Sequence, residues 1–173
     1  MKTMRSLKSM LIIAGVSVSL MACSQTKYDK QQSKEQVVQS SVSKIEAQKI
    51  LDAYLKVKDA LVKTDGEAAS ISAKELVSLL NSKDELVGKI KFDAEHIMDT
   101  KNASHQRDHF NTLSDNVYVL VKSTSANEST IYRQFCPMAM DNKGAYWLSA
   151  EKEVNNPYFG DMMLHCGSVK EEL

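Results

Sequence analysis

The sequence contains few of the residues that interrupt helices. Only six glycines and two prolines occur among its 173 residues, and both prolines, Pro137 and Pro157, lie in the last quarter of the chain. Because glycine and proline are unfavourable inside helices, most of the sequence can form long uninterrupted helices. A hydrophobic content of 43% is enough for one core and no more at this length. The composition therefore favours a single helical globular domain.

The sequence also lacks an excess of positive charge. Basic and acidic side chains number 22 each, so the formal net charge is zero, and aromatic residues make up only 6%. Proteins that bind nucleic acid carry clustered lysine and arginine that neutralise phosphates, often with aromatic side chains that stack on bases. No such basic stripe is present in this sequence. We therefore expect no nucleic acid partner.

Sequence patterns typical of catalysis are missing as well. There is no nucleophile paired with a base, no glycine-rich phosphate loop and no pair of carboxylates at a spacing suited to acid–base chemistry. We therefore expect that the protein is not an enzyme.

The first 22 residues have the layout of a secretory signal. Residues 1–10 carry three positive charges and no negative one, and the twelve residues from 11 to 22 form an apolar run. Twelve residues are too few to cross a bilayer, which takes about 20, but they suit the apolar region of a signal peptide. The segment Leu20-Met21-Ala22-Cys23 resembles a bacterial lipobox, in which the cysteine is lipidated. The alternative is an ordinary cleaved signal followed by an unrelated cysteine.

The lipobox resemblance implies a signal peptide over residues 1–22 and a lipidated Cys23. Several acyl chains on one cysteine anchor a protein stably to a membrane, where a single chain is marginal. Residues 24–43 are rich in glutamine, serine and lysine and are too polar to pack, which predicts a flexible tether. We therefore expect a lipoprotein of the bacterial cell envelope that faces the periplasm and is attached through its lipid to the inner or the outer membrane.

From Lys44 onwards, apolar residues recur at intervals of three and four, which is the period of amphipathic helices. Ser43 is the expected N-cap of the first helix. The connections between helices are short, so we expect a mainly helical fold in which residues 44–123 form an antiparallel four-helix bundle. Residues 124–173 form a tail rich in cysteine and methionine, packed on this bundle. The four helices are predicted at about residues 44–62, 67–80, 84–101 and 104–122.

The tail concentrates residue types that are rare elsewhere. It holds Cys136 and Cys166, the only cysteines after residue 23, with the single tryptophan and four of the nine methionines. Short strands are predicted at residues 131–135 and 145–148, which would form a β-hairpin, and one helical turn is predicted at residues 162–166. Thiolate, thioether and imidazole together suit Cu(I), and thiolate with imidazole also suits Zn(II).

Three interpretations of the two tail cysteines are open. In the first, their thiolates bind Cu(I), or Zn(II) or another soft metal, together with thioether or imidazole ligands. In the second, they form a disulfide, as an oxidising compartment permits, and no metal is bound; closing a loop of about 30 residues would contribute about 3–4 kcal/mol. In the third, the pair is redox-active, although the spacing is not that of a Cys-X-X-Cys motif. The ligands considered beside the cysteines are Met138 and Met163, then Met140, Met162 and His165.

The methionines favour the metal interpretation. Methionine is common in cores, so one or two beside a cysteine carry little information. Four within 26 residues of a polar tail, each within four positions of a cysteine, are harder to explain as packing. Tyr146, Trp147 and Phe159 would then surround the metal and control the access of solvent. The alternative is that these aromatic residues pack the tail onto the helices.

Two histidines on the fourth predicted helix are further ligand candidates. His105 and His109 are four residues apart and so lie on one face, a spacing that binds metal in zinc-binding helices. The glutamate of that motif is missing. Surface helices also carry such pairs without a metal, and a further alternative is that one of the two completes the site of the tail. His96, on the third helix, is expected to be a partly buried packing residue.

The tail sequence FCPMAMDNKGAYWLSAEKEVNNPYFGDMMLHCG resembles the signature of the domain of unknown function 3347 family. Upstream, the stretches DALVKTDGEAAS, QRDHF and VYVLVK are similar to the helical part of this family, so the resemblance runs from about Ala47 to Val169. The CPM segment is also similar to metal-binding segments of copper ATPases and adaptors. One departure is Asn155, where the family pattern has arginine; it affects surface charge and not ligation.

This family occurs as small envelope lipoproteins and attached to periplasmic adaptor subunits of heavy-metal efflux systems. By position, the resemblance implies Cys136, Met138, Met163 and Cys166 as metal ligands, with His109 as an addition. Residues and resemblance together predict an envelope lipoprotein that binds a soft metal, Cu(I) first, for sequestration or for handover to an efflux adaptor. The alternative is a non-metal interaction module of the envelope whose tail is clasped by a disulfide.

Overall fold

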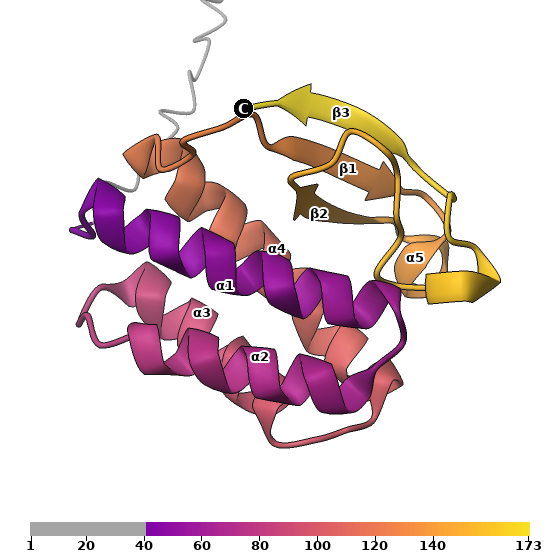
Figure 1. The fold of residues 1–173 in the computed structure, drawn as a ribbon, viewed down its shortest axis with the longest axis horizontal. Coiled ribbons are helices and arrows are strands. Elements are labelled where there is room, and N and C mark those ends of the chain that lie inside the picture. The colour runs from indigo at the N-terminus through magenta and orange to yellow at the C-terminus, as the bar shows by residue number, and fades with distance from the viewer. Residues whose placement is uncertain (1–40) are drawn as a thin grey trace, which may run out of the picture. The chain divides into compact units, whose positions relative to one another are not determined.

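The computed structural model describes residues 41–173. The predicted signal peptide, the lipidation site at Cys23 and most of the predicted tether lie outside the described residues. The described chain forms four long helices followed by a tail with three short strands (Figure 1). The helices are α1 (Lys44–Val62), α2 (Gly66–Leu79), α3 (Glu85–Met98) and α4 (Ala103–Thr124), and the tail contains β1 (Tyr132–Cys136), α5 (Ala139–Asn142), β2 (Ala145–Ser149), the 3-10 turn η1 (Gly160–Met162) and β3 (Ser168–Glu172).

Each long helix begins where a polar side chain caps its first turn. Ser43 and Glu46 form a capping box before α1, in which each side chain accepts from the backbone N–H of the other. Asp65, Asp84 and Asn102 accept from the first N–H groups of the next three helices. Such caps satisfy donors that a helix leaves unpaired. The four predicted helices are confirmed, with ends shifted by at most three residues.

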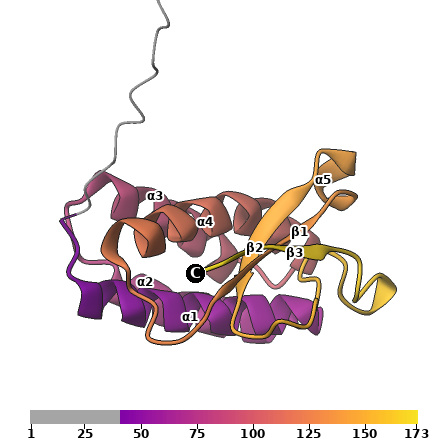
Figure 2. The ribbon, with the colours of Figure 1, turned by 90° about the horizontal axis from the view of Figure 1, so that it is seen from above.

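The fold has three layers. α1 packs against α2 and α4, and α3 packs against α2 and α4. The sheet rests on α4 and α1 through β2, and it covers the side of these two helices that faces away from α2 and α3 (Figures 1 and 2). The prediction of a mainly helical fold with a hairpin in its tail is confirmed.

β1 is the central strand of an antiparallel sheet with the order β2-β1-β3. Cys136 lies opposite Ala145 in β2, and Phe135 lies opposite Ser168 in β3. The sequence pattern predicts no strand at β3, whose residues are mostly charged and alternate between exposed and half-exposed. Because Cys166 lies two residues before β3, this pairing brings the two tail cysteines to the same end of the sheet.

The single helical turn predicted in the tail is present, but it lies at η1 rather than at residues 162–166. Met163 leaves helical geometry with φ −148° and ψ 54°. Asn156, which is buried, donates to the carbonyl oxygen of Leu164 through its backbone and to that of Cys166 through its side chain, each over 2.8 Å. These hydrogen bonds tie the segment from Leu164 to Cys166 to the loop before η1.

A buried chain of hydrogen bonds joins the sheet to α1 and α4. The N–H of Leu148 in β2 donates over 3.1 Å to the hydroxyl of Tyr54, which lies 2.8 Å from Oγ of Ser114. Ser114 donates to the carbonyl oxygen of Phe110, so the Tyr54 hydroxyl is the donor to Ser114. Burial raises the pKa of the Tyr54 phenol above its ordinary value. One satisfied polar network thus holds the tail to the helices.

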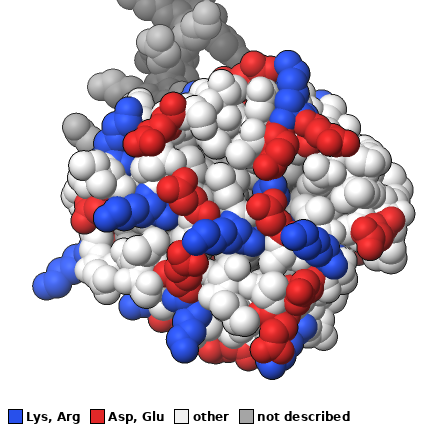
Figure 3. Space-filling model, in the orientation of Figure 1, with Lys and Arg blue, Asp and Glu red and all other residues white. Residues whose placement is uncertain are grey.

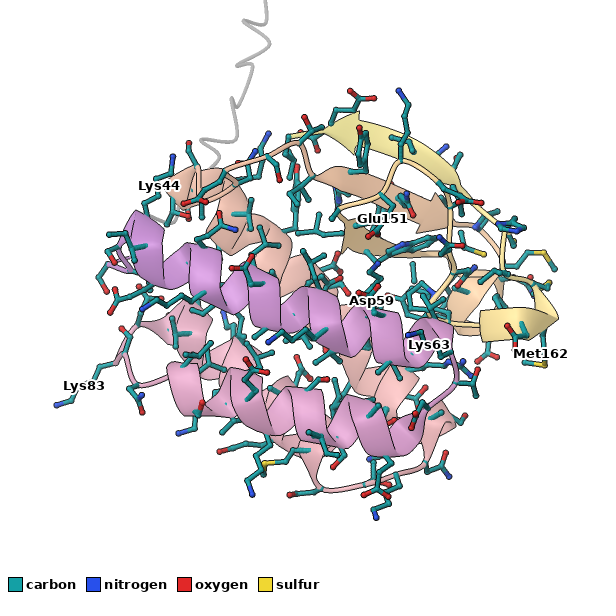
Figure 4. All side chains as sticks on the ribbon, viewed as in Figure 1. Lys44, Asp59, Lys63, Lys83, Glu151 and Met162 are labelled. Carbon is teal, nitrogen blue, oxygen red and sulfur yellow. The ribbon has the colours of Figure 1, made fainter. Side chains whose placement is uncertain are left out.

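An ion pair supplies a second attachment of the tail. Lys58 on α1 is 2% exposed, and its Nζ lies 3.0 Å from Oε2 of Glu151 and 2.5 Å from Oδ1 of Asp59. Figure 4 shows Glu151 between the sheet and the stretch of α1 that carries Asp59. The amide of Gln134 in β1 donates to the carbonyl oxygens of three consecutive residues from Glu151 onwards. The loop after β2 is therefore fixed both to α1 and to its own sheet.

The packed structure begins a few residues before α1. Val42 is buried, and the backbone N–H and hydroxyl of Ser41 lie 2.8 and 3.1 Å from Oδ2 of Asp84, the residue that caps α3. The polarity of residues 24–43 predicts a tether up to residue 43, whereas the fold includes Ser41 and Val42. The chain therefore enters the domain at the N-terminal ends of α1 and α3.

Lysine and arginine alternate with aspartate and glutamate on the face shown in Figure 3, and no basic stripe crosses it. In addition to the pair at Lys58, one ion pair joins α1 to α2, two join α4 to strands of the sheet, and one joins α2 to the loop before α4. In the part of the chain from residue 41 onwards, no helix has both the length and the apolar composition needed to cross a bilayer.

Replacing Tyr54 by phenylalanine removes only the hydroxyl of the buried network. The N–H of Leu148 then loses its acceptor, and an unpaired buried polar group costs about 1–3 kcal/mol. We expect the free energy of unfolding in urea to fall by this amount, with the m-value unchanged. Tyr132→Phe is the matched control, because Tyr132 is partly exposed, and its effect should stay below about 0.5 kcal/mol. Equal losses in the two variants would contradict the role of the network.

Candidate metal centre

The two tail cysteines meet at one end of the sheet. Cys136 is the last residue of β1 and is buried, and Cys166 is partly buried before β3. Their Sγ atoms lie 3.1 Å apart, and both are free thiols. The side chain of Asn156 holds the backbone of Cys166 in place through its carbonyl oxygen. We call Cys136 and Cys166 the thiol pair.

The separation of the thiol pair lies between those of its two main candidate states. A disulfide bond is about 2.05 Å long. Two thiolates on one tetrahedral ion, each about 2.3 Å from the metal, lie roughly 3.8 Å apart. The observed 3.1 Å therefore needs a movement of roughly 1 Å or less to reach either state. The geometry fits both the metal and the disulfide interpretations.

The thiol of Cys166 is poorly suited to redox exchange. Its pKa is raised above the ordinary value, first by the hydrogen bond with Cys136 and then by burial, both of which favour the protonated form. The thiolate is the nucleophile in thiol–disulfide exchange, and reactive cysteines have lowered pKa values. The interpretation of the pair as redox-active therefore gains no support from this geometry.

An unusual backbone follows β1. Met140, Asp141 and Asn142 have φ values of 53°, 57° and 64°, all in the left-handed region. α5 is thus a left-handed turn, closed by a hydrogen bond of 3.0 Å from the N–H of Gly144 to the carbonyl oxygen of Ala139. Asparagine and aspartate tolerate this region, whereas methionine occupies it at a cost of about 1–2 kcal/mol. Strained residues of this kind gather at ligand-binding positions.

All four methionines of the tail line one surface hollow of about 480 Å³. Met162 is 76% exposed and Met138 is 47% exposed, and Met140 and Met163 are half-buried. Figure 4 shows Met162 at the outer end of the tail. Methionines that fill a core are buried, so the exposure of Met162 and Met138 excludes core packing for these two. We call this surface the methionine hollow; its other side is formed by Ser104, Arg107 and Asp108 of α4, with Asp141 and Phe159.

The methionine hollow and the thiol pair are built from the same two loops. Met138 follows Cys136 by two residues, and the N–H of Cys166 donates to the carbonyl oxygen of Met163 over 3.0 Å. The loops lie at the same end of the molecule in both ribbon views, beyond the C-terminal end of α1 (Figures 1 and 2). The structure therefore gathers the predicted sulfur ligands at one end of the domain.

Arg107 of α4 holds the second of these loops. Its Nε donates over 2.7 Å to the carbonyl oxygen of Pro157, and its Nη2 donates to the carbonyl oxygen of Leu61 and to Oγ1 of Thr64. Burial lowers the pKa of this guanidinium from its ordinary value. At Gly160, with φ 56°, a Cβ atom would stand 2.3 Å from Oγ1 of Thr64, so only glycine lets the loop approach this closely.

Of the three aromatic residues predicted around the metal, Phe159 lines the methionine hollow and the other two do not. Trp147 is buried and meets the ring of Tyr158 edge to face, with centroids 6.0 Å apart. The ring centroid of Tyr146 lies 3.9 Å from the guanidinium carbon of Arg133. Trp147 and Tyr146 therefore take part in the packing of the sheet.

Among residues 41–173, no group of three or more histidine, cysteine, aspartate or glutamate side chains is arranged to hold a metal ion. His165 is exposed, and its Nδ1 lies 2.8 Å from the carbonyl oxygen of Val154. In its own loops the thiol pair is accompanied by the thioethers of the methionine hollow and by the imidazole of His165, whose Nε2 is left free by this contact. This donor set fits Cu(I) better than harder ions.

His105 and His109 are close to each other, as predicted, but they do not line the methionine hollow. Nδ1 of His109 lies 3.1 Å from Oδ1 of Asp93 on α3. Successive residues of a helix are 100° apart, so these histidines lie on a face next to the one that carries Asp108 into the hollow. Ligation of the thiol pair's metal by His109 stays a prediction.

Replacing Arg107 by lysine keeps the positive charge but removes the planar guanidinium group that donates to three oxygen acceptors. Because hydrogen bonds to charged groups contribute about 1.5–3 kcal/mol each, we expect the free energy of unfolding to fall by at least about 1.5 kcal/mol. Hydrogen exchange should quicken at residues 155–166, which this arginine holds, and stay unchanged in α2 and α3. Uniform quickening across the domain would contradict a local role.

In the reduced, chelator-treated protein, Cys166 should react with iodoacetamide only at alkaline pH. Alkylation needs the thiolate, and the hydrogen bond that the Cys166 thiol makes to Cys136 raises the pKa of Cys166. The alkylation rate should therefore increase only at a pH above the ordinary thiol pKa of about 8.5. Cys136→Ala removes that bond and should move the pH profile to lower pH. An unchanged profile would show that the two thiols do not interact.

Comparison with protein-family models matches residues 50–129 to a family described as Protein of unknown function (DUF3347). No curated protein and no solved structure matches the chain. The matched range covers most of α1 and all of α2, α3 and α4, and it ends before β1. It therefore includes His105 and His109 but neither the thiol pair nor the methionines of the hollow. Through residues 50–129, the chain belongs to the family Protein of unknown function (DUF3347).

Proposed function

We propose that the tail binds one soft metal ion, Cu(I), through the thiol pair and thioethers of the methionine hollow. The observation that carries this proposal is the convergence of four methionines on one open hollow, in the two loops that also carry Cys136 and Cys166. Thioether ligands select Cu(I) over harder ions. They also remain competent donors where thiols are oxidised.

The exposure of the methionines supports this proposal against simple packing. Met162 and Met138 are large apolar side chains on the surface of the described domain, at 76% and 47% exposure. Exposing them forgoes the stabilisation of about 1.5–3 kcal/mol that burial gives such a side chain. A left-handed Met140 adds backbone strain at the same site. A role as metal ligands accounts for both.

The charges around the hollow suit a monovalent cation. Arg107 contributes one positive charge, and Asp108 and Asp141 contribute two negative ones. Arg107 is committed to backbone and hydroxyl acceptors in the loop. A cation in the hollow would therefore be adjacent to a net negative charge, which favours its binding.

The location of the protein in the cell envelope is part of the same proposal. The N-terminal sequence supports a lipid anchor at Cys23, which would hold the protein at the periplasmic side of a membrane. A metal held by exposed thioethers is accessible to a second protein, which suits sequestration followed by handover to an efflux adaptor. No catalytic step is needed for this role.

A second function is favoured by one observation, the 3.1 Å between the sulfurs of the thiol pair. Oxidation to a disulfide would tie the end of β1 to the start of β3 and contribute about 3–4 kcal/mol. The protein would then be an envelope interaction module with a clasped tail and no metal. The methionine hollow would serve as its contact surface, because methionine-rich surfaces adapt to partners.

The test is an anaerobic titration of the reduced full-length chain with Cu(I) against a competing chelator, with a free-thiol count on protein taken from the envelope. We expect one tightly bound ion per chain. Cys166→Ser and Met163→Leu should each weaken binding at least about 10-fold, since changes around metal ligands alone have effects of that size. Met98→Leu is the control, because Met98 lies at the end of α3, outside the tail.

Two results would decide against the metal proposal. One is the absence of binding in the reduced chain. The other is binding that Met163→Leu and Cys166→Ser leave unchanged. Blocked thiols in envelope protein, together with either result, would establish the disulfide module instead.

A further inference from the structure

Three of the four histidines of the chain gather on the outer side of the α3–α4 pair. His109 of α4 stacks on His96 of α3 with ring centroids 4.3 Å apart and an interplanar angle of 22°. The ring of His105 meets that of His109 edge-on at 5.0 Å. We call His96, His105 and His109 the histidine cluster. It depends on the packing of α3 against α4, because His96 is remote from the other two in sequence.

Two members of the cluster have one ring nitrogen already fixed. Nδ1 of His109 lies 3.1 Å from Oδ1 of the buried Asp93, and Nδ1 of His96 lies 2.9 Å from the carbonyl oxygen of Phe92. Carboxylate and carbonyl oxygens only accept, so each Nδ1 carries a proton and donates it. In the neutral imidazole the lone pair is then on Nε2. Metal-binding histidines are prepared in this way, with the second nitrogen donating to a carboxylate or carbonyl group.

We propose that the histidine cluster is a second metal site, with nitrogen ligands only, for a borderline divalent cation such as Zn(II) or Cu(II). Imidazole is the ligand these ions prefer among neutral side chains. His105 and His109 supply the i, i+4 pair that binds metal on one helix face. His96 supplies a third ligand from the neighbouring helix. Three histidines with an open fourth position form a known arrangement for Zn(II).

Binding requires a change of side-chain rotamer. Stacked rings with nearly parallel planes direct their in-plane lone pairs side by side, so His96 and His109 do not yet converge on one point. This agrees with the absence of a ready-made group of ligands within residues 41–173. His105 is exposed and His96 is partly exposed, and such side chains change rotamer within nanoseconds. In doing so His96 would give up its hydrogen bond to the carbonyl oxygen of Phe92. His109 is fixed by Asp93 and would serve as the reference ligand.

The exposed ring of Phe92 supports a function for this surface. It is 57% exposed, and its centroid lies 4.4 Å from that of His96 and 6.2 Å from that of His109. An apolar ring beside the ligands would exclude water from one side of the ion and so strengthen its binding. The buried Asp93 places a carboxylate next to His109.

This proposal does not rest on the tail. Neither His96, His105 nor His109 lines the methionine hollow, and all three lie in the helical part of the chain. The two sites also differ in donor chemistry, because one offers sulfur and the other nitrogen. Failure of Cu(I) binding in the tail would leave the histidine cluster unaffected.

The test measures binding of Zn(II) and of Cu(II), each added alone as a simple salt, to the full chain carrying Cys166→Ser. Cys166 is the more exposed of the two cysteines, so this substitution removes one thiol of the pair and leaves the buried Cys136 unchanged. We expect one divalent ion per chain. His105→Ala and His109→Ala should each lower the affinity at least about 100-fold, and Asp93→Asn, which removes only the orienting carboxylate, about 10- to 100-fold. His165→Ala is the control and should change nothing.

Substitution of Co(II) identifies the donors, because nitrogen ligation gives d–d bands without the charge-transfer absorption that thiolate ligands add. Nitrogen-only spectra that disappear in His105→Ala support the site. Since His105 is exposed, loss of the fold would not explain that disappearance. Binding of Cu(II) but not Zn(II), with the same dependence on histidine, supports the site and identifies its ion. Affinity unchanged in both His105→Ala and His109→Ala, or a thiolate band in the Co(II) spectrum, would overturn the proposal.

Discussion

The geometry of the tail depends on one half-buried guanidinium. Arg107 donates to oxygen atoms of the end of α1, of the turn after it and of the loop before η1, and so fixes that loop against two helices. The exposed methionines have no core to position them, so this backbone decides where their sulfur atoms lie. The same arginine borders the methionine hollow. Its charge there is outweighed by Asp108 and Asp141, which leaves the hollow open to a cation.

The two proposed metal sites lie beside two neighbouring faces of α4. Ser104 and Asp108 face the sulfur-rich tail, whereas His109 stacks on His96 of α3 and His105 lies beside His109. One residue of offset in the sequence moves a side chain by 100° around the helix, so a single stretch of six residues, 104–109, contributes to both surfaces. Ligand type then separates the ions, since thioethers select Cu(I) and imidazoles select borderline divalent ions. Packing and not sequence distance keeps the two sets of donors apart.

The helices were predictable from sequence because their signals are local. Ser43 with Glu46 and the apolar period define α1 without help from the rest of the chain. β3 was not predictable, since SVKEE has little strand propensity and forms a strand only because β1 offers a free edge. The roles of Arg107 and Asn156 also depend on acceptors distant in sequence or in other loops. The contact of His96 with His109 follows from helix packing, which no local pattern encodes. The family match, finally, covers the helices, whereas the tail carried most of the resemblance.

The direction of α1 gives the domain two distinct ends. The chain enters at Ser41, beside the start of α1, and η1 contacts the other end of the same helix, where Gly160 approaches Thr64. Nineteen residues of helix span about 28 Å at 1.5 Å per residue. The thiol pair and the methionine hollow therefore lie at the end of the domain opposite to Ser41. If the tail binds metal as proposed, a molecule that takes the ion would approach the end of the domain opposite to Ser41.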